Sequence, residues 1–275
     1  MKTASILIRT KNEARSLGAT LDAVLEQDLA PHEVFVIDSG SHDATLEVAA
    51  RYPVRIMRIP PREWSYSRAL NLGAREATGE FIVCLSAHCP PIRRTWLATL
   101  LRHFDDPRVA AVWGPNLSPG RHAPIMDPPI RQEPGTYTVA NRRFGLVNSN
   151  SALRRSLWLE FPFDESLPAT EDKKWGQEAM ARGYCLVHDP QAAVWHERHP
   201  AINSFKRNRA VMAGYVILFP ELQSQGNPLW ITLRGAFRKI AFHIRTRDAA
   251  KLRLDLRTAP SKLAAVVGNY LGERR

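Results

Sequence analysis

The sequence predicts an α/β protein with a mostly parallel central sheet that is covered by helices on both faces. Three apolar runs, at residues 5–9, 33–37 and 80–85, have the length of strands, and each is followed by polar residues. Helical patterns follow the first two runs, so the chain repeats a strand–loop–helix unit. Continuous apolar runs are typical of parallel strands that are buried on both faces, whereas half-exposed strands alternate.

The first two units fill the N-terminal part of the chain. The strand at 5–9 leads through a polar loop at 10–13 to a helix whose apolar positions begin at Leu17. The strand at 33–37 leads through a glycine-containing turn to a helix at 44–52. Sheets of this kind bind their ligands where the strands end, at the carboxyl edge.

The next two strands extend a polar rim at that edge. A strand at 54–59 leads through a polar stretch to a helix at 71–78, which Gly79 ends, and the strand at 80–85 follows. One polar residue after a strand is commonly a turn former. Several such strand ends together indicate a ligand site. The side chains expected to gather at this rim are Asp38, Arg68, Ser86 and His88.

An acidic pair, Glu171 and Asp172, opens a further helical stretch. The helix dipole and capping favour acidic residues in a first turn, so one interpretation is that Thr170 or Asp172 merely starts the helix. The other interpretation is that two adjacent carboxylates serve chemistry. The polar strand ends elsewhere in the chain favour the second interpretation.

A resemblance to a known family is carried by four segments: SILIRTKNEARSLGATLDAVLEQ, EVFVIDSGSHDATLEVA, NLGAREATGEFIVCLSAH and FDESLPATEDKKWGQEAMARGYCLVHDPQAAVWHERH. In order and spacing they resemble the family 2 inverting glycosyltransferases of the GT-A fold, over residues 3 to 200. Within that family the chain looks most like the bacterial rhamnosyltransferase-like group, which shares the Leu-Ser-Ala-His segment. The resemblance implies transfer of a sugar, with inversion, from a nucleotide-diphosphate donor to an acceptor hydroxyl. It points to bacterial cell-surface polysaccharide or glycolipid synthesis on a glycan or lipid-linked acceptor, with dTDP-rhamnose as the first donor to test.

The resemblance also assigns the donor-binding residues. It implies that Thr10, Asn12 and Glu13 border the nucleotide, that Asp38 faces the base or ribose, and that Arg68 approaches the diphosphate. The commoner family pattern has an arginine directly before the asparagine of the helix. Here Leu70 precedes Asn71 and the arginine lies two residues earlier.

The segment from Ser86 to His88 stands where the family carries an Asp-x-Asp motif. In that motif the final carboxylate holds a divalent cation, Mn²⁺ or Mg²⁺, which neutralises the charge on the leaving diphosphate. Imidazole is suited to Mn²⁺, whereas Mg²⁺ prefers oxygen ligands, so the histidine puts the use of a metal in question. His88 forming a strand-end hydrogen bond is the alternative. His196 matches a family position that completes the metal site or bonds the phosphates directly, and His199 is expected at the surface.

The same resemblance assigns the chemistry to the acidic pair. An inverting transfer needs one base that takes the proton of the acceptor hydroxyl. Asp172 matches that base, and Glu171 matches a neighbour that orients the base or the acceptor. Trp175 either offers an aromatic face to a sugar ring or packs on the sheet. The stretch at 113–144, rich in proline and glycine, is expected to be an irregular active-site loop that contacts the acceptor.

Charge divides the chain into a catalytic domain at 1–200 and a basic, amphipathic helical extension at 201–275. The extension holds 14 lysine and arginine residues against 4 aspartate and glutamate, so it carries 10 of the net +11 charges. Basic residues interleaved with apolar ones at helical spacing, from Leu233 onward, suit an anionic membrane surface. Packing on the catalytic domain with a solvated basic face is the alternative.

Composition limits the remaining possibilities. A chain of 275 residues with 44% hydrophobic content can bury a full core. No apolar run has the length of a bilayer span and no signal-peptide pattern is present, so we expect a cytoplasmic protein, peripheral at the inner face of the plasma membrane if the extension binds there. An odd number of cysteines, without metal-motif spacing, favours reduced thiols.

Two other function classes agree with parts of the sequence. A sugar nucleotidyltransferase has a similar sheet, but it needs a glycine-rich loop after the first strand, and residues 10–13 contain no glycine. A basic nucleic-acid or membrane binding protein without catalysis would account for the pI near 10. Against nucleic acid, the excess charge lies outside the sheet domain and no nucleic-acid motif is present.

Overall fold

The computed structural model describes residues 2–118, 127–196 and 201–224 of the chain. The chain divides into two compact units. The first contains Met1–Ser166 and Glu171–Glu197, and the second contains Leu167–Thr170 and the residues from Arg198 onward. The predicted amphipathic pattern from Leu233 onward and the predicted surface position of His199 lie outside the described residues.

The first unit is built on an eight-stranded sheet, which confirms the expected α/β class. Its strands lie in the order β3 (Arg55–Arg58), β2 (Glu33–Asp38), β1 (Ala4–Thr10), β4 (Phe81–Ser86), β8 (Asn150–Arg154), β5 (Val109–Trp113), β9 (Cys185–His188) and β7 (Ile130–Gln132). The first four strands are mutually parallel, as are β5 and β9, while β8 and β7 run antiparallel to their neighbours. A second, two-stranded sheet pairs β6 (Asn116–Leu117) with β10 (Val194–Trp195).

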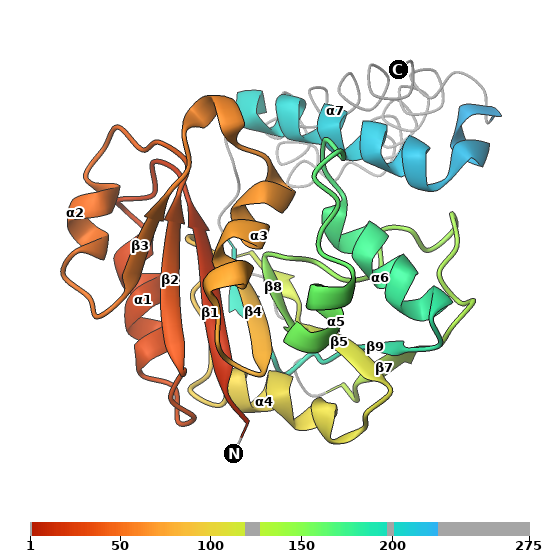
Figure 1. Ribbon diagram of the computed structural model, residues 1–275, viewed down its shortest axis with the longest axis horizontal. Coiled ribbons are helices and arrows are strands. Elements are labelled where there is room, and N and C mark those ends of the chain that lie inside the picture. Colours follow the sequence, from red (N-terminus) through yellow and green to blue (C-terminus); the bar gives the residue numbers. More distant parts are fainter. Residues whose placement is uncertain (1, 119–126, 197–200, 225–275) are drawn as a thin grey trace, which may run out of the picture. The chain divides into compact units, whose positions relative to one another are not determined.

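Helices cover both faces of the sheet, as the continuous apolar strands predict (Figure 1). Alternate residues of β1 point to opposite faces: Ile6 and Ile8 belong to one core cluster and Leu7 to the other. The first cluster is closed by α1 (Leu17–Leu25), α2 (Thr45–Ala49) and α4 (Trp96–Arg102). The second is closed by α3 (Tyr66–Glu76), α5 (Arg155–Glu160) and α6 (Glu171–Ala181).

Two predicted elements differ from the structure. The helix expected from residue 71 begins at Tyr66, because the Ser65 side chain accepts a hydrogen bond from the Arg68 backbone N–H at 3.0 Å and caps the first turn. The stretch 113–144, expected to be irregular, contributes the short strands β6 and β7. Both pair with strands that lie more than 50 residues away in the sequence, a signal that local composition does not carry.

The register of the strands assembles one polar edge. Thr10 lies opposite Asp38, and Arg9 lies opposite Ser86, so the carboxyl ends of β1, β2 and β4 coincide (Figure 1). Because β8 runs antiparallel to β4, its first residue, Asn150, pairs near the same edge, opposite Leu85. The loop residues directly before β8 therefore lie at the edge where the parallel strands β1, β2 and β4 end.

The second unit contains α7 (Ala201–Leu218), followed by a 3₁₀ turn at Pro220–Ser224. Within this unit Gly214 of α7 lies against the segment that precedes α6. A Cβ at Gly214 would stand 2.2 Å from the Thr170 hydroxyl and 2.6 Å from the Ala169 carbonyl oxygen, so only glycine fits there. None of the helices in the described ranges has the length and apolar character needed to cross a membrane.

Candidate active site

The acidic pair lies at the first turn of α6, as the sequence predicts. Thr170, directly before the pair, has a φ of 69°, a left-handed conformation that is rare for a β-branched residue. Glu171 is buried, with 4% of its surface exposed. The Asn148 side-chain amide donates to Glu171 Oε1 at 3.3 Å, and the Asn148 backbone N–H donates to Asp172 Oδ2 at 3.2 Å. Asn148, in the loop before β8, thus holds both carboxylates at the carboxyl edge of the sheet.

Burial gives Glu171 an unusual proton affinity. Desolvation and the neighbouring Asp172 carboxylate raise the pKa of Glu171 to about 7, although the nearby Arg9 guanidinium opposes the shift. A carboxyl group with a pKa near neutrality, at the edge where a sheet binds its ligands, is typical of a functional site. Asp172 is only partly buried, so of the two carboxyl groups it is the one open to a substrate.

Arg9, near the end of β1, is a cation of this cluster. Its Nη1 lies 3.6 Å from Glu171 Oε1, and the exposed fractions of the two side chains are 14% and 5%. Its Nη2 donates to the Asn148 carbonyl oxygen at 3.4 Å. The guanidinium carbon stands 5.3 Å from the ring centre of Tyr66, within reach of a cation–π contact.

Lys173 anchors the loop that leads to Asn148. Its Nζ is buried and donates to the carbonyl oxygens of Gly145 and Leu146, both at 2.7 Å. Burial lowers the pKa of Lys173, and the carboxylates of Asp172 and Glu171 oppose that shift. The side chain therefore fastens the 145–148 loop to the first turn of α6, which keeps Asn148 beside the acids.

His88, two residues beyond the end of β4, is backed by a carboxylate. Its Nδ1 lies 2.8 Å from Glu13 Oε1, and Glu13 Oε2 accepts from the Ser16 hydroxyl at 2.7 Å. The Glu13 backbone N–H in turn donates to Thr45 Oγ1 at 2.8 Å. A histidine whose Nδ1–H donates to a carboxylate presents Nε2 as a lone pair, and this is the arrangement that metal-binding histidines commonly have.

Three possible metal ligands lie together at this point. His88, Cys89 and His196 each offer an atom that lies within 4.8 Å of those of the other two, and the two imidazole ring centres are 4.9 Å apart. Of the two cations that the resemblance implies, Mn²⁺ accepts imidazole nitrogen more readily than Mg²⁺ does, whereas a thiol such as that of Cys89 is a ligand for Zn²⁺. The two histidines are therefore the residues that fit a divalent cation such as Mn²⁺, with imidazole in place of carboxylate.

The other residues predicted to border the donor organise the loops after β1 and β2. Asp38 accepts from the Gly40 N–H at 2.9 Å and from the Ser41 N–H at 3.0 Å, so it shapes its own turn, in which Gly40 has a φ of 86°. The Asn12 backbone N–H donates to Ser41 Oγ at 2.8 Å, which joins the two loops. Thr10 Oγ1 is buried and has no hydrogen-bond partner among the described residues.

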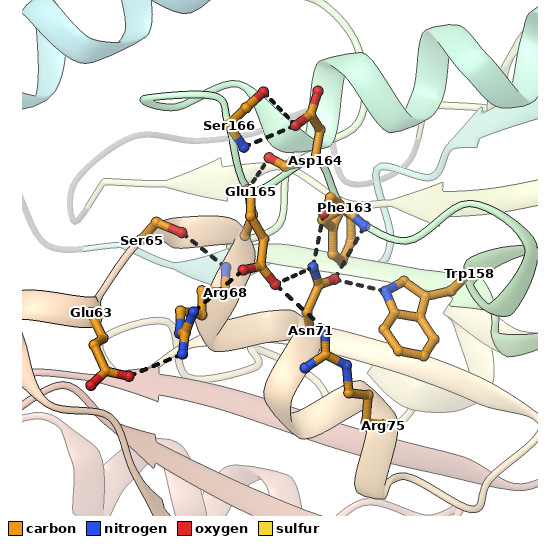
Figure 2. Close-up of polar contacts among 11 residues, drawn as sticks. Glu63, Ser65, Arg68, Asn71, Arg75, Trp158, Phe163, Asp164, Glu165 and Ser166 are labelled. Carbon is orange, nitrogen blue, oxygen red and sulfur yellow. Dashed lines mark hydrogen bonds and ion pairs between the residues drawn. The ribbon is translucent and has the colours of Figure 1, made fainter.

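Arg68 does not join the other rim residues in any hydrogen bond or ion pair between described residues. Its guanidinium pairs with Glu63 at 3.0 Å and approaches Glu165 at 3.8 Å (Figure 2). These residues line a pocket of about 250 Å³ between the end of β3 and the outer face of α3. The predicted approach of Arg68 to a diphosphate therefore has no support from the contacts of its side chain.

Trp175 is a core residue, which corrects the expectation that it offers a face to a sugar. Its side chain is only 2% exposed, and its Nε1–H donates to the Phe161 carbonyl oxygen at 2.9 Å. The Phe161 ring stacks on it at 5.1 Å between centres, and Phe163 lies 6.3 Å away. Since both the ring and its polar atom are occupied, the packing interpretation is the one the structure supports.

Ser86 remains at the rim, where its N–H donates to the Ser149 carbonyl oxygen at 3.2 Å.

Four residues of the cluster were missed from the sequence: Arg9, Asn148, Lys173 and the possible ligand Cys89. Arg9 lies inside an apolar strand pattern, where a charged residue is a signal of a buried partner. Asn148 lies in a stretch with no periodic pattern and gave no such signal. Its place beside α6 depends on the antiparallel pairing of β8 with β4, which the local sequence does not indicate.

Comparison with known proteins identifies relatives of this architecture. The profile of a family described as Glycosyl transferase family 2 matches residues 5–158. The O-antigen chain rhamnosyltransferase RfbN of Salmonella typhimurium is 24% identical over 208 residues, which are 71% of this chain and 66% of RfbN. The O-antigen chain rhamnosyltransferase WbaN of Salmonella anatum is 27% identical over 189 residues, which are 64% of this chain and 60% of WbaN. The chain thus spans less than two thirds of the length of each of these relatives.

Solved structures show the same fold. The mannosyltransferase PcManGT from Pyrobaculum calidifontis, in complex with GDP-Man and Mn²⁺, has a TM-score of 0.64 at 23% identity and covers 97% of this chain and 86% of its own. S. aureus TarS 1–349 in complex with UDP-GlcNAc has a TM-score of 0.61 at 16% identity and covers 100% and 91%. At these identities the likeness concerns the fold, and it confirms the expected GT-A architecture.

Proposed function

The chain belongs to glycosyl transferase family 2, and on that premise we propose that it transfers a sugar, with inversion, from a nucleoside-diphosphate donor to an acceptor hydroxyl. The observation that carries the proposal is the acidic pair at the carboxyl edge of the sheet, with buried Glu171 and partly exposed Asp172 held by Asn148. In this reading Asp172 is the general base. One carboxylate suffices, because an inverting transfer forms no covalent glycosyl-enzyme.

Asp172 keeps the acceptor capacity that a base needs. Its Oδ2 accepts from the Asn148 N–H, and its Oδ1 accepts from the Lys173 N–H at 2.7 Å. Each carboxylate oxygen can accept two hydrogen bonds, so both retain a position for the hydroxyl proton. The two N–H donors hold the carboxylate in place while the proton moves from the acceptor oxygen to Asp172. Glu171, whose pKa is raised, is proposed to keep Asp172 or the acceptor correctly oriented.

The donor is proposed to lie along the ends of β1, β2 and β4, near Thr10, Asn12, Asp38 and Ser86. His88 and His196 would hold a divalent cation there, with Glu13 backing His88. Such a cation, when bound, neutralises charge that develops on the leaving diphosphate. The two Salmonella relatives are named O-antigen rhamnosyltransferases, so we propose a role in bacterial cell-surface polysaccharide synthesis, with dTDP-rhamnose as the first donor to test and a glycan or lipid-linked acceptor.

The deciding test compares Asp172→Asn with wild type at saturating donor and acceptor. The asparagine keeps the shape but cannot take up the proton, so turnover should fall by about 10² to 10⁴-fold. Donor affinity, measured by calorimetry, should stay close to wild type. Glu171→Gln is the matched control and should lower turnover less, because its role is orientation. An Asp172→Asn enzyme that retains wild-type turnover would return the pair to the simpler role of starting a helix.

A further inference from the structure

We propose that Arg9 is a positioning residue for the transfer reaction: from β1 it fixes the place and the charge of the pair Glu171–Asp172. This inference rests on the proposed role of Asp172 as the base. Arg9 touches neither reacting atom in this scheme, because it acts through Glu171 and Asn148.

The geometry links Arg9 to both carboxylates by two routes. The first is direct, from Nη1 to Glu171 Oε1 at 3.6 Å between two side chains that are almost entirely buried. The second passes through Asn148, whose carbonyl oxygen accepts from Arg9 at 3.4 Å while its two N–H groups donate to the two acids. Arg9 and Asn148 therefore form a closed network with the pair.

The Arg9 guanidinium makes few other interactions among the described residues. Tyr66 covers one face of the guanidinium at 5.3 Å. Nη1 is buried and has no hydrogen-bond partner among the described residues, so its interaction there is the ion pair with Glu171. Burying an arginine costs several kcal/mol unless it is paired, and Glu171 is the carboxylate that pairs with it.

The charged groups that face Glu171 can be named from each element around it. On α6 these are Asp172 and Lys173, on β1 Arg9, and on β4 the thiol of Cys84. Burial raises the pKa of Cys84 to about 12, so the thiol is neutral at physiological pH. The Lys173 ammonium is committed to the carbonyl oxygens of residues 145 and 146. Among the described residues, Arg9 is thus the cation in ion-pair contact with Glu171.

The consequence is a shift in the pH dependence of turnover when Arg9 loses its charge. Without the guanidinium, two adjacent carboxylates repel each other unopposed and take up a proton at a higher pH. The pair as a whole is then protonated at a higher pH, so the acid limb of the kcat profile moves upward. An opposite charge within 4–6 Å shifts titration by about 1 to 3 units, so we expect a shift of about one unit or more.

The experiment measures kcat from pH 5 to 9 for wild type, Arg9→Gln and Arg9→Lys. The limb should rise by about a unit in Arg9→Gln and return toward wild type in Arg9→Lys, which restores a cation. Arg9→Met, neutral and without hydrogen-bonding demands, is the second neutral variant if Arg9→Gln does not fold. Arg154→Gln is the matched control: Arg154 is a partly buried strand arginine that bonds backbone carbonyls away from the acids. It should leave the limb unmoved.

Two outcomes separate this proposal from the one on which it rests. If Asp172→Asn loses turnover but the limb stays at its wild-type position in the neutral Arg9 variants, the role of Arg9 is overturned and the base assignment stands. If Asp172→Asn keeps wild-type turnover, the base assignment fails, and this role of Arg9 fails with it. A limb that moves equally in Arg154→Gln would show a general effect on the fold and would also overturn the proposal.

Discussion

At the scale of single residues, a histidine occupies a position where the family resemblance leads one to expect a carboxylate. The structure gives His88 an outer carboxylate, Glu13, and two neighbours, Cys89 and His196, that can also bind a metal. The carboxylate that the family motif supplies as a metal ligand is here replaced by a histidine, and a carboxylate, Glu13, lies hydrogen-bonded to that histidine instead. An imidazole hydrogen-bonded to a carboxylate is a stronger ligand than an unsupported one.

This arrangement predicts the effect of removing the outer carboxylate. Glu13→Gln should weaken Mn²⁺ binding about 10- to 100-fold, because partners of ligating histidines typically contribute that much. His88→Ala should weaken both Mn²⁺ and nucleoside-diphosphate binding further. Electron paramagnetic resonance of free Mn²⁺ gives the affinity, and His32→Ala, an exposed histidine that bonds Thr78, is the control. Equal Mn²⁺ affinity in the His88→Ala and His32→Ala proteins would contradict the assignment.

Glu171 predicts a pH dependence of stability. Its pKa is raised from 4.5 to about 7 in the folded chain, so the folded state binds the proton more tightly and loses that advantage as the pH rises through this window. Glu171→Gln removes the titration. The stability of Glu171→Gln relative to wild type should therefore increase between about pH 4.5 and 7, by at most about 1.4 kcal/mol per pH unit, and level off above. Thermal unfolding at pH 5, 6, 7 and 8 measures it, and a constant difference would contradict it.

The residues show which parts of the site a sequence can reveal. The acidic pair and the histidine at the end of β4 are visible because they interrupt regular patterns. Trp175 shows the opposite case. From the sequence, an aromatic residue one turn beyond a site is equally consistent with stacking on a sugar ring and with packing in the core. The choice depends on Phe161, which stacks on the indole from a different segment.

At the scale of elements, a buried asparagine of α3 makes several hydrogen bonds to the loop before α6. The Asn71 side chain donates to the Phe163 carbonyl oxygen at 2.8 Å and to Glu165 at 2.9 Å (Figure 2). Its oxygen accepts from the Trp158 Nε1–H and the Phe163 N–H, both at 3.1 Å. All four hydrogen-bonding positions of the amide are therefore used.

We predict that Asn71→Ala lowers the free energy of unfolding by roughly 2–4 kcal/mol, because it leaves the buried donors of Trp158 and Phe163 unsatisfied. Arg75→Ala is the contrasting variant in the same network: Arg75 is 63% exposed and lies 3.7 Å from Glu165. An exposed ion pair contributes about 0 to 1 kcal/mol, so this change should be small. Urea denaturation compares the two, and similar losses would refute the argument.

The elements also show where a sequence stops being informative. The strands β1, β2 and β4 follow from their apolar runs, because burial on both faces leaves a continuous pattern. The short strands β6 and β7 do not, since each exists by pairing with a distant partner. The start of α3 was missed by five residues because its cap is a serine in a polar stretch that resembles a loop.

At the scale of the whole molecule, the charge distribution leads to a prediction about membranes. Ten of the net +11 charges lie after residue 200. We predict that the full chain binds vesicles containing anionic lipid, that binding fades as salt shortens the screening length below about 8–10 Å, and that removing residues 231–275 abolishes it. Sedimentation with anionic and neutral vesicles measures the effect. Equal binding by the full and shortened chains would exclude a role for this segment.

The edge of the large sheet has a consequence for the protein in concentrated solution. Among the described strands β3 has a neighbour on one side only, so it presents an unpaired row of backbone donors and acceptors to which another strand could add. Two of its four residues, Arg55 and Arg58, are exposed arginines, and they flank Ile56, which is 38% exposed. Arg55 is paired with Glu33 and Glu76 of its own chain, so the charge of Arg58 is the one most free to oppose a second copy. Charged side chains on an edge strand disfavour the addition of another strand, so we expect two copies that meet at β3 to resist joining their sheets.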